Sequence, residues 1–146
     1  MTIHASAVLI GSRAALIRGA AGSGKSSLAF ALIRAGEAGA LPFTRLVGDD
    51  RLHVQTAHGR LLVRPAETLK GLIEVRGLGI RRVPFEPMAV VGVVVDLGAA
   101  DTERFPPANV AVTEVAGIRL PRLGVAPGED PLALLFAALR TTESGY

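Results

Sequence analysis

The feature that most constrains the fold is the stretch Gly19-Ala20-Ala21-Gly22-Ser23-Gly24-Lys25-Ser26, which fits the phosphate-binding pattern G-x-x-x-x-G-K-[ST] at every position. In such a loop the glycines let backbone N–H groups turn toward phosphate oxygens. Lys25 would reach the β- and γ-phosphates of a nucleotide, and the Ser26 hydroxyl would be a ligand for Mg²⁺. A chain with this motif needs a strand before the loop and a helix after it.

The flanking sequence meets this requirement. Ala14–Arg18 predicts a buried strand, and Ser26–Ala35 predicts a helix with Gly36 as its left-handed stop. The helix N-terminus adds free N–H groups and partial positive charge where phosphate would lie. A glycine-rich turn that binds nothing is the alternative, but the context favours a nucleoside triphosphate site. Its expected nucleotide contacts are Gly19, Gly22, Ser23, Gly24, Lys25, Ser26 and Ser27.

Composition narrows the class of protein. At 146 residues, with 49% apolar and 20% charged residues, the chain is expected to be a single folded domain over residues 1–146. The absence of cysteine excludes disulfides and Cys-based zinc sites. No apolar run reaches the ~18 residues of a membrane span, so we expect no membrane partner and a cytoplasmic location. The net charge of +3 is dispersed and aromatics are only 4%, which argues against nucleic-acid binding.

Acidic residues follow two predicted strands. Leu41–Asp50 reads as a short strand ending in Asp49 and Asp50, where ligands of open α/β sheets bind. Adjacent strand residues face opposite ways, so only one of the pair would point into the site if the strand stays regular. A solvated acidic turn is the alternative. Asp96 closes the apolar run Met88–Leu97, and this position suits either a magnesium-holding acid or ordinary turn chemistry.

The remaining segments complete a mixed α/β pattern. His4–Ile17 and Leu52–Arg64 each predict a β-hairpin, and Met88–Leu97 predicts a central buried strand. In Leu72–Ile80, two glycines around Leu78 suggest close backbone approach. Pro131–Arg140 predicts a closing helix with Asp130 as N-cap.

Four segments together resemble the catalytic domain of HPr kinase/phosphorylase: His4, the phosphate loop, Val47–Arg51 and Leu72–Ile80 with its Glu-Val-Arg-Gly-Leu-Gly-Ile string. The resemblance covers essentially the whole chain. It implies an α/β P-loop kinase domain similar to the nucleotide-binding core of phosphoenolpyruvate carboxykinase, with a mixed sheet and flanking helices. It also implies an enzyme that uses ATP and Mg²⁺ to phosphorylate a serine of HPr, the phosphocarrier of the bacterial sugar phosphotransferase system, and that forms a homo-oligomer, typically a hexamer.

The resemblance assigns roles residue by residue. Asp49 matches the catalytic aspartate that accepts the serine proton, and His4 matches a histidine that hydrogen-bonds this aspartate. Arg104 matches an arginine that steadies the transferring phosphoryl group. The metal ligands implied are Ser26, Asp50 and Glu74. Asp96 has no counterpart role, so the resemblance favours a structural function for it.

Two departures qualify this identification. The chain resembles the short family members that consist of the catalytic domain alone. Relatives carry a basic loop associated with phosphorolysis where this chain has Val125–Asp130, with acids in place of the expected bases, which argues against the reverse reaction. The altered loop leaves open a catalytically inactive ATP-binding module that regulates a protein partner. A small-molecule kinase is disfavoured, because the sequence contains no arginine-rich lid.

Overall fold

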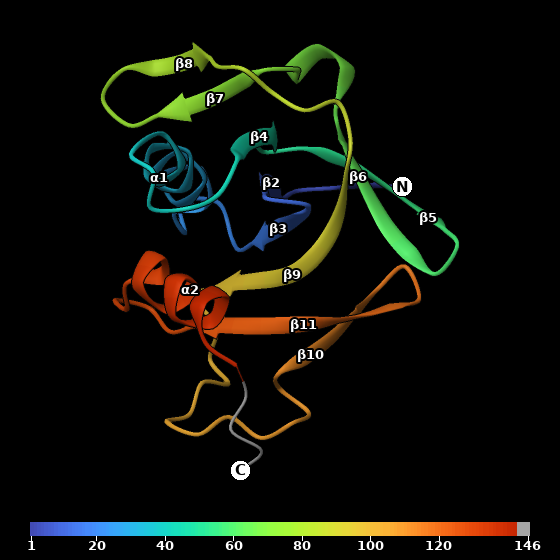
Figure 1. Cartoon of the computed structure of the whole chain (residues 1–146), viewed down its shortest axis with the longest axis vertical. Helices are drawn as coiled ribbons and strands as arrows, with labels where there is room; N and C mark the ends of the chain where they lie inside the picture. Colours follow the sequence, from blue (N-terminus) through green and yellow to red (C-terminus); the bar gives the residue numbers. More distant parts are fainter. Residues whose placement is uncertain (143–146) are drawn as a thin grey trace.

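A computed structural model of the chain describes residues 1–142. Figure 1 shows a curled sheet with both helices on its left side and a separate hairpin above the first helix. No helix in this range is long and apolar enough to cross a membrane. The elements in chain order are β1 (Thr2–Ile3), β2 (Ser6–Ile10), β3 (Arg13–Arg18), α1 (Lys25–Glu37), β4 (Thr44–Gly48), β5 (Leu52–Ala57), β6 (Arg60–Pro65), η1 (Glu67–Leu69), β7 (Leu72–Val75), β8 (Gly79–Arg82), β9 (Ala89–Leu97), β10 (Val112–Val115), β11 (Ile118–Val125) and α2 (Pro131–Arg140).

The main sheet is mixed. Its nine strands follow the order β1-β5-β6-β9-β3-β2-β4, with β11 also paired to β9 and β10 paired to β11. The start of β9 pairs antiparallel with β6, whereas its end pairs parallel with β11. Two different strands therefore share one side of β9, and the long strand curves through the molecule between them (Figure 1). The mixed sheet with flanking helices expected from the sequence is confirmed.

Strand direction decides where a site can form. β3, β9 and β11 run parallel. β2 is antiparallel to both β3 and β4, so β4 runs in the same direction as β3. The carboxyl ends of these four strands consequently lie along one edge of the sheet, where the phosphate loop and Asp49 follow strand ends and Asp96 is the penultimate residue of β9.

Both faces of the sheet are buried, which explains the continuous apolar runs. On β3, Leu16 packs into one core and its neighbour Ile17 into the other, and Val94 and Val95 divide in the same way on β9. The first core lies among the strands alone. The second lies beneath α1 and α2 and includes Ile73 of the β7–β8 hairpin. The phosphate-loop strand is therefore fixed from both sides.

Two expectations about glycines are wrong. Helix α1 continues through Gly36 to Glu37, and the left-handed residue is Gly39, with φ of 80°. At Gly36 a Cβ would lie 2.4 Å from that of Thr44, so this glycine permits close packing of α1 on β4. Gly77 and Gly79 face open space instead, and their φ values of 87° and 91° show that they serve the turn of the β7–β8 hairpin.

Candidate active site

The phosphate loop has the backbone geometry that the motif demands. Gly22 and Gly24 have φ of 80° and 101°, which L side chains rarely adopt. The Ser23 N–H donates to the Ala20 carbonyl at 3.0 Å and tightens the loop. Gly24 is the N-cap of α1 and supplies no side-chain hydrogen bond to it. The first N–H groups of α1 are therefore not capped by a side chain, as an anion site at a helix N-terminus requires.

Lys25 lies across its own loop. Its Nζ donates to the carbonyls of Gly19 at 2.9 Å and Ala20 at 3.2 Å. These bonds hold the ammonium against the loop rather than in open solvent. The positive charge is thus concentrated where the loop would receive phosphate.

The carboxylate of Asp49 joins three segments of the chain. Ser6 Oγ of β2 donates to it at 2.5 Å, and Ser26 Oγ of α1 donates at 2.8 to 2.9 Å. The backbone N–H of Glu74 in β7 donates at 3.1 Å. Asp49 is only 5% exposed, so these bonds compensate for burying its charge. This carboxylate fixes the P-loop serine relative to β4 and to the hairpin.

Asp50 also faces the site, and a left-handed backbone conformation rather than strand alternation places it there. Strand β4 ends at Gly48, and Asp50 has φ of 69°, in the left-handed region. The alternation that would send one acid away therefore does not apply, because the strand has already ended. Asp50 is exposed and lines the cavity in front of the phosphate loop. The acid pair thus divides into a buried carboxylate beneath Ser26 and an exposed one in the cavity.

This cavity, which we call the phosphate cavity, has a volume of about 310 Å³. It is lined by Ala21, Gly22, Gly24, Lys25, Ser26, Ser27, Asp50, Glu74 and Arg76. The expected metal-binding residues are therefore brought together in one hollow with the lysine.

The oxygen donors of this cavity suit Mg²⁺. Ser26 supplies a hydroxyl, and Asp50 and Glu74 supply carboxylates, which are the hard oxygen ligands that this ion prefers. Residues 1–142 contain no group of three or more His, Cys, Asp or Glu side chains close enough to hold a metal by themselves. Mg²⁺ usually binds through one or two carboxylates, with phosphate oxygens and water completing its shell, so the donor set fits.

His4 lies near Ser6 in the sequence, and Ser6 donates to Asp49. His4 itself makes no hydrogen bond to Asp49 among the residues that the structure describes. It is exposed and precedes β2, the strand that provides Ser6. Among residues 1–142, the side-chain hydrogen bonds to the Asp49 carboxylate come from Ser6, Ser26 and the Glu74 N–H alone. A role for His4 in tuning Asp49 stays a prediction.

Arg104 lies apart from the phosphate cavity. It belongs to the segment between β9 and β10, which extends below β11 and away from α1 in Figure 1. Its guanidinium is 5.3 Å from the ring centroid of Phe105, and it lines a different hollow of about 250 Å³ beside Arg122. The structure therefore does not bring Arg104 together with Lys25.

Two residues of the site were not predicted. Ser6 is fully buried and holds Asp49, but a serine within an apolar strand carries no recognisable motif. Arg76 lines the phosphate cavity, on the turn that follows β7. The sequence pattern that could have indicated Arg76 is the Glu-Val-Arg string, in which the charges of Glu74 and Arg76 stand two residues apart.

Asp96 forms ion pairs with two arginines. Arg18 donates to it at 2.7 and 2.8 Å, and Arg122 donates at 2.5 Å and continues to Asp101. Burial favours a higher pKa for Asp96, but hydrogen bonds and charge from Arg18 and Arg122 outweigh it and lower the pKa below its ordinary value. For Arg122, burial is likewise outweighed by Asp96 and Asp101, and its pKa is raised. Asp96 thus links β3, β9 and β11.

Comparison with known proteins places these features in a family. The family model described as HPr Serine kinase C-terminal domain matches residues 1–86. This range contains every residue that lines the phosphate cavity, together with Ser6 and Asp49. Arg104 and Asp96 lie outside it.

Individual relatives give the same picture. The chain is 41% identical over 69 residues to an HPr kinase/phosphorylase of Clostridium tetani, and the match covers 47% of this chain and 20% of that protein. It is 40% identical over 80 residues to one of Streptococcus thermophilus, with 54% and 24% covered. The matched region is therefore less than a quarter of each relative's length.

A solved structure is similar over nearly the whole chain. The Hpr(Ser) kinase/phosphatase from Coxiella burnetii aligns with a TM-score of 0.77 and 26% identity, covering 96% of this chain and 94% of that chain. The structural likeness thus extends well beyond residue 86, through β9, β11 and α2.

Proposed function

Because the chain belongs to the HPr serine kinase C-terminal domain family, we propose that it transfers the γ-phosphoryl group of ATP to a serine of an HPr-like phosphocarrier protein, with Mg²⁺ as cofactor. The observation that carries the proposal is the contact between Asp49 and Ser26, at 2.8 to 2.9 Å, beside the lysine of the phosphate loop. It joins the acid of the kinase reaction to the nucleotide-binding motif in one site.

In this proposal the loop binds the triphosphate. The N–H groups at the start of α1 and the ammonium of Lys25 hold the β- and γ-phosphates. Ser26, Asp50 and Glu74 would hold Mg²⁺, which would supply positive charge to neutralise the charge that develops on the phosphoryl group. Arg76 lines the same cavity and is the residue we assign to steadying the transferring group. It replaces Arg104 in that role, since Arg104 lines another hollow.

Asp49 is the proposed proton acceptor. A carboxylate that accepts hydrogen bonds from two serine hydroxyls can exchange the Ser26 bond for a bond from the incoming serine hydroxyl of the substrate. Ser6 and the Glu74 N–H would keep the carboxylate oriented during this exchange. His4 has the role of hydrogen-bonding Asp49 in the substrate complex, and thus of a positioning residue.

A kinase assay with HPr tests the proposal. Purified chain, ATP, Mg²⁺ and HPr from the same organism should yield phosphoserine, and Lys25→Ala and Asp49→Asn should both remove it. Lys70→Ala is the matched control, because the chain has only one other lysine and it pairs with the exposed Glu67. Undiminished phosphoserine formation by Asp49→Asn would remove this residue from the catalytic role.

One set of observations favours an alternative, a regulatory module that binds ATP without transferring phosphate. Asp49 is almost fully buried and its carboxylate is bonded within the protein. In the loop after β11, Glu129 accepts from the Ala126 N–H and Asp130 from the Leu132 N–H, so these acids stabilise local structure. This alternative predicts ATP binding with no phosphoserine, and the same assay separates the two. Phosphorolysis forms no part of either proposal.

Assembly and location complete the proposal. We expect a cytoplasmic homo-oligomer, with a hexamer as the form implied by the family. Light scattering of the purified chain measures the mass of the assembly, and a monomer at micromolar concentration would contradict this expectation.

A further inference from the structure

A second hollow lies beside the phosphate loop. It has a volume of about 280 Å³ and shares Ser23 with the loop, whereas the phosphate cavity contains Ala21, Gly22 and Gly24. We call it the strand-end hollow, because it is formed by the ends of β9 and β11 and the start of α2. Its lining residues are Ser23, Leu97, Gly98, Val125, Ala126, Pro127, Gly128, Glu129 and Pro131.

The two hollows lie on opposite sides of the phosphate-loop strand. In the sheet, β2 lies between β3 and β4, and β4 is the strand that leads to Asp49 and Asp50. Strands β9 and β11 lie on the other side of β3. A triphosphate held by the loop, with its reacting end toward Asp49, therefore has its other end toward the ends of β9 and β11.

Among residues 1–142, the phosphate loop and the strand-end hollow are in direct contact. A Cβ at Gly19 would lie 2.3 Å from Ser23 Oγ and 3.2 Å from the Cβ of Leu97, so the loop packs directly on the end of β9. Ser23 Oγ is buried and has no hydrogen-bond partner among the described residues. Burying a hydroxyl without a partner is unfavourable, and a polar atom of a ligand in this hollow would relieve this cost by bonding to Ser23 Oγ.

The two hollows differ in the charge of their lining residues. The phosphate cavity contains Lys25 and Arg76. Among the described residues 1–142, no basic residue lines the strand-end hollow, and Glu129 is its one charged residue. Glu129 Oε1 accepts from the Ala126 N–H, and Oε2 can accept from an amino group of a ligand, whereas the carboxylate repels phosphate. The anionic part of a nucleotide is thus directed to the first hollow and an uncharged part with amino donors to the second.

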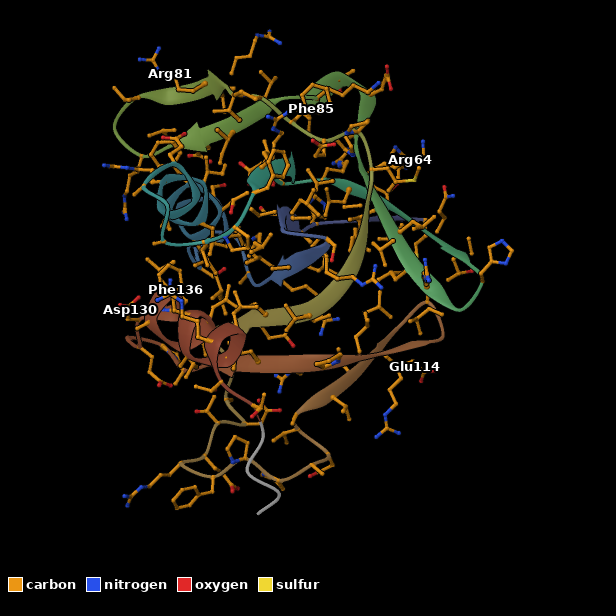
Figure 2. All side chains as sticks on the ribbon, viewed as in Figure 1. Arg64, Arg81, Phe85, Glu114, Asp130 and Phe136 are labelled. Carbon is orange, nitrogen blue, oxygen red and sulfur yellow. The ribbon has the colours of Figure 1, made fainter. Side chains whose placement is uncertain are left out.

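The apolar walls of the strand-end hollow suit a flat ring. Leu97 and Val125 are buried, and the rings of Pro127 and Pro131 contribute further apolar surface. Figure 2 shows Asp130, the N-cap of α2 between Glu129 and Pro131, on the side of this helix nearest α1. Sites for drug-sized ligands have volumes of roughly 300–1,000 Å³, so this smaller hollow fits a single base rather than a whole nucleotide.

We propose that the strand-end hollow binds the base of the nucleoside triphosphate, a purine with an exocyclic amino group, between Leu97 and the segment Val125–Pro131. The proposal rests on the proposed function in that it requires a nucleotide on the phosphate loop. Apart from Ser23, its residues lie beyond residue 86, outside the part of the chain matched by the family model.

Photo-crosslinking of the unmodified protein tests the proposal most directly. The chain is irradiated with 8-azido-ATP and Mg²⁺, digested, and the labelled residues are identified by mass spectrometry. Label on residues 97–98 or 125–131 is the expected result. Label confined to residues 50–76 would overturn the proposal, because the base would then lie on the side of Asp50.

A filling variant gives an independent measurement. Ala126→Phe should raise the Kd for ATP about tenfold or more and leave that for inorganic tripolyphosphate unchanged within error. Ala108→Phe, at an exposed position in the segment between β9 and β10, is the matched control. Unchanged ATP affinity in Ala126→Phe would count against the base site.

The two proposals fail in different ways. If the unmodified chain binds neither ATP nor tripolyphosphate, the proposed function fails, and the base site with it. If it binds both equally, the base contributes nothing and only the base site fails. Should Ala126→Phe lose tripolyphosphate binding as well, the crosslinked residues of the unmodified protein decide the matter.

Discussion

Replacing Ser6 by alanine removes one of the donors that hold the buried Asp49. Ser6 is fully buried, and its Oγ donates to Asp49 at 2.5 Å. A hydrogen bond to a charged group contributes about 1.5–3 kcal/mol, and we expect Ser6→Ala to lower the free energy of unfolding by that amount. For a chain of this size the loss corresponds to a decrease in Tm of about 3–12 °C. Because Ser6 does not line the phosphate cavity, the KM for ATP should stay within error while kcat falls.

Urea unfolding, followed by circular dichroism, measures the stability loss, and steady-state kinetics with HPr separate kcat from KM. Ser12→Ala is the matched control, since Ser12 is exposed in the turn between β2 and β3. A Ser6→Ala protein as stable as the unmodified chain would refute the assignment of Ser6 as a support of the Asp49 carboxylate. An increase in KM for ATP with unchanged kcat would contradict its role as a positioning residue.

Three further outcomes are expected. Gly19→Ala should raise the Kd for ATP at least about tenfold in calorimetry, because the added Cβ would lie 2.3 Å from Ser23 Oγ, and a smaller change would contradict the close approach. Arg76→Ala should lower kcat about 10²-fold and Arg104→Ala no more than about twofold, and the reverse order would return the phosphoryl-steadying role to Arg104. The ion pairs of Asp96 lower its pKa, so they stabilise the fold above the unfolded pKa and are lost as the pH falls through the folded one. Asp96→Asn should therefore lower stability by about 1–3 kcal/mol at pH 7 and flatten its decrease below about pH 4, as denaturant titrations across pH would measure.

Local patterns predicted most of the elements that carry the site. The phosphate-loop motif requires a strand and a helix around it, and β3 and α1 have the expected places. The apolar run of β9 predicted a buried strand because both of its faces meet a core. Asp130 and Pro131 marked the start of α2, where the Asp130 carboxylate accepts from the Leu132 N–H at 3.0 Å.

Contacts between distant segments were beyond the reach of the sequence. Ser6 and Asp49 are 43 residues apart, and only the pairing of β2 with β4 brings them together. The orientation of Asp50 depends on a left-handed residue directly after β4, which alternation along a regular strand does not describe. Gly36 looked like a helix stop, but the reason for glycine there is its contact with Thr44.

Residue roles taken from a resemblance depend on how well each segment aligns. Asp49 and Ser26 lie in continuous motifs, and the structure brings them into hydrogen-bond contact. Arg104 lies in the segment between β9 and β10 and lines a hollow separate from the phosphate cavity. Arg76 lies within the Glu-Val-Arg string, where charges two residues apart are equally typical of an ion pair on the surface, so the sequence alone does not assign it to the site.

Mass spectrometry of HPr from the same organism, after incubation with this protein, ATP and Mg²⁺, tests the central claim most directly. The account predicts one phosphoryl group on a serine of HPr, absent with Lys25→Ala and retained with Lys70→Ala. Unmodified HPr in the presence of a chain that binds ATP would contradict the kinase and leave the regulatory module as the function that the site supports.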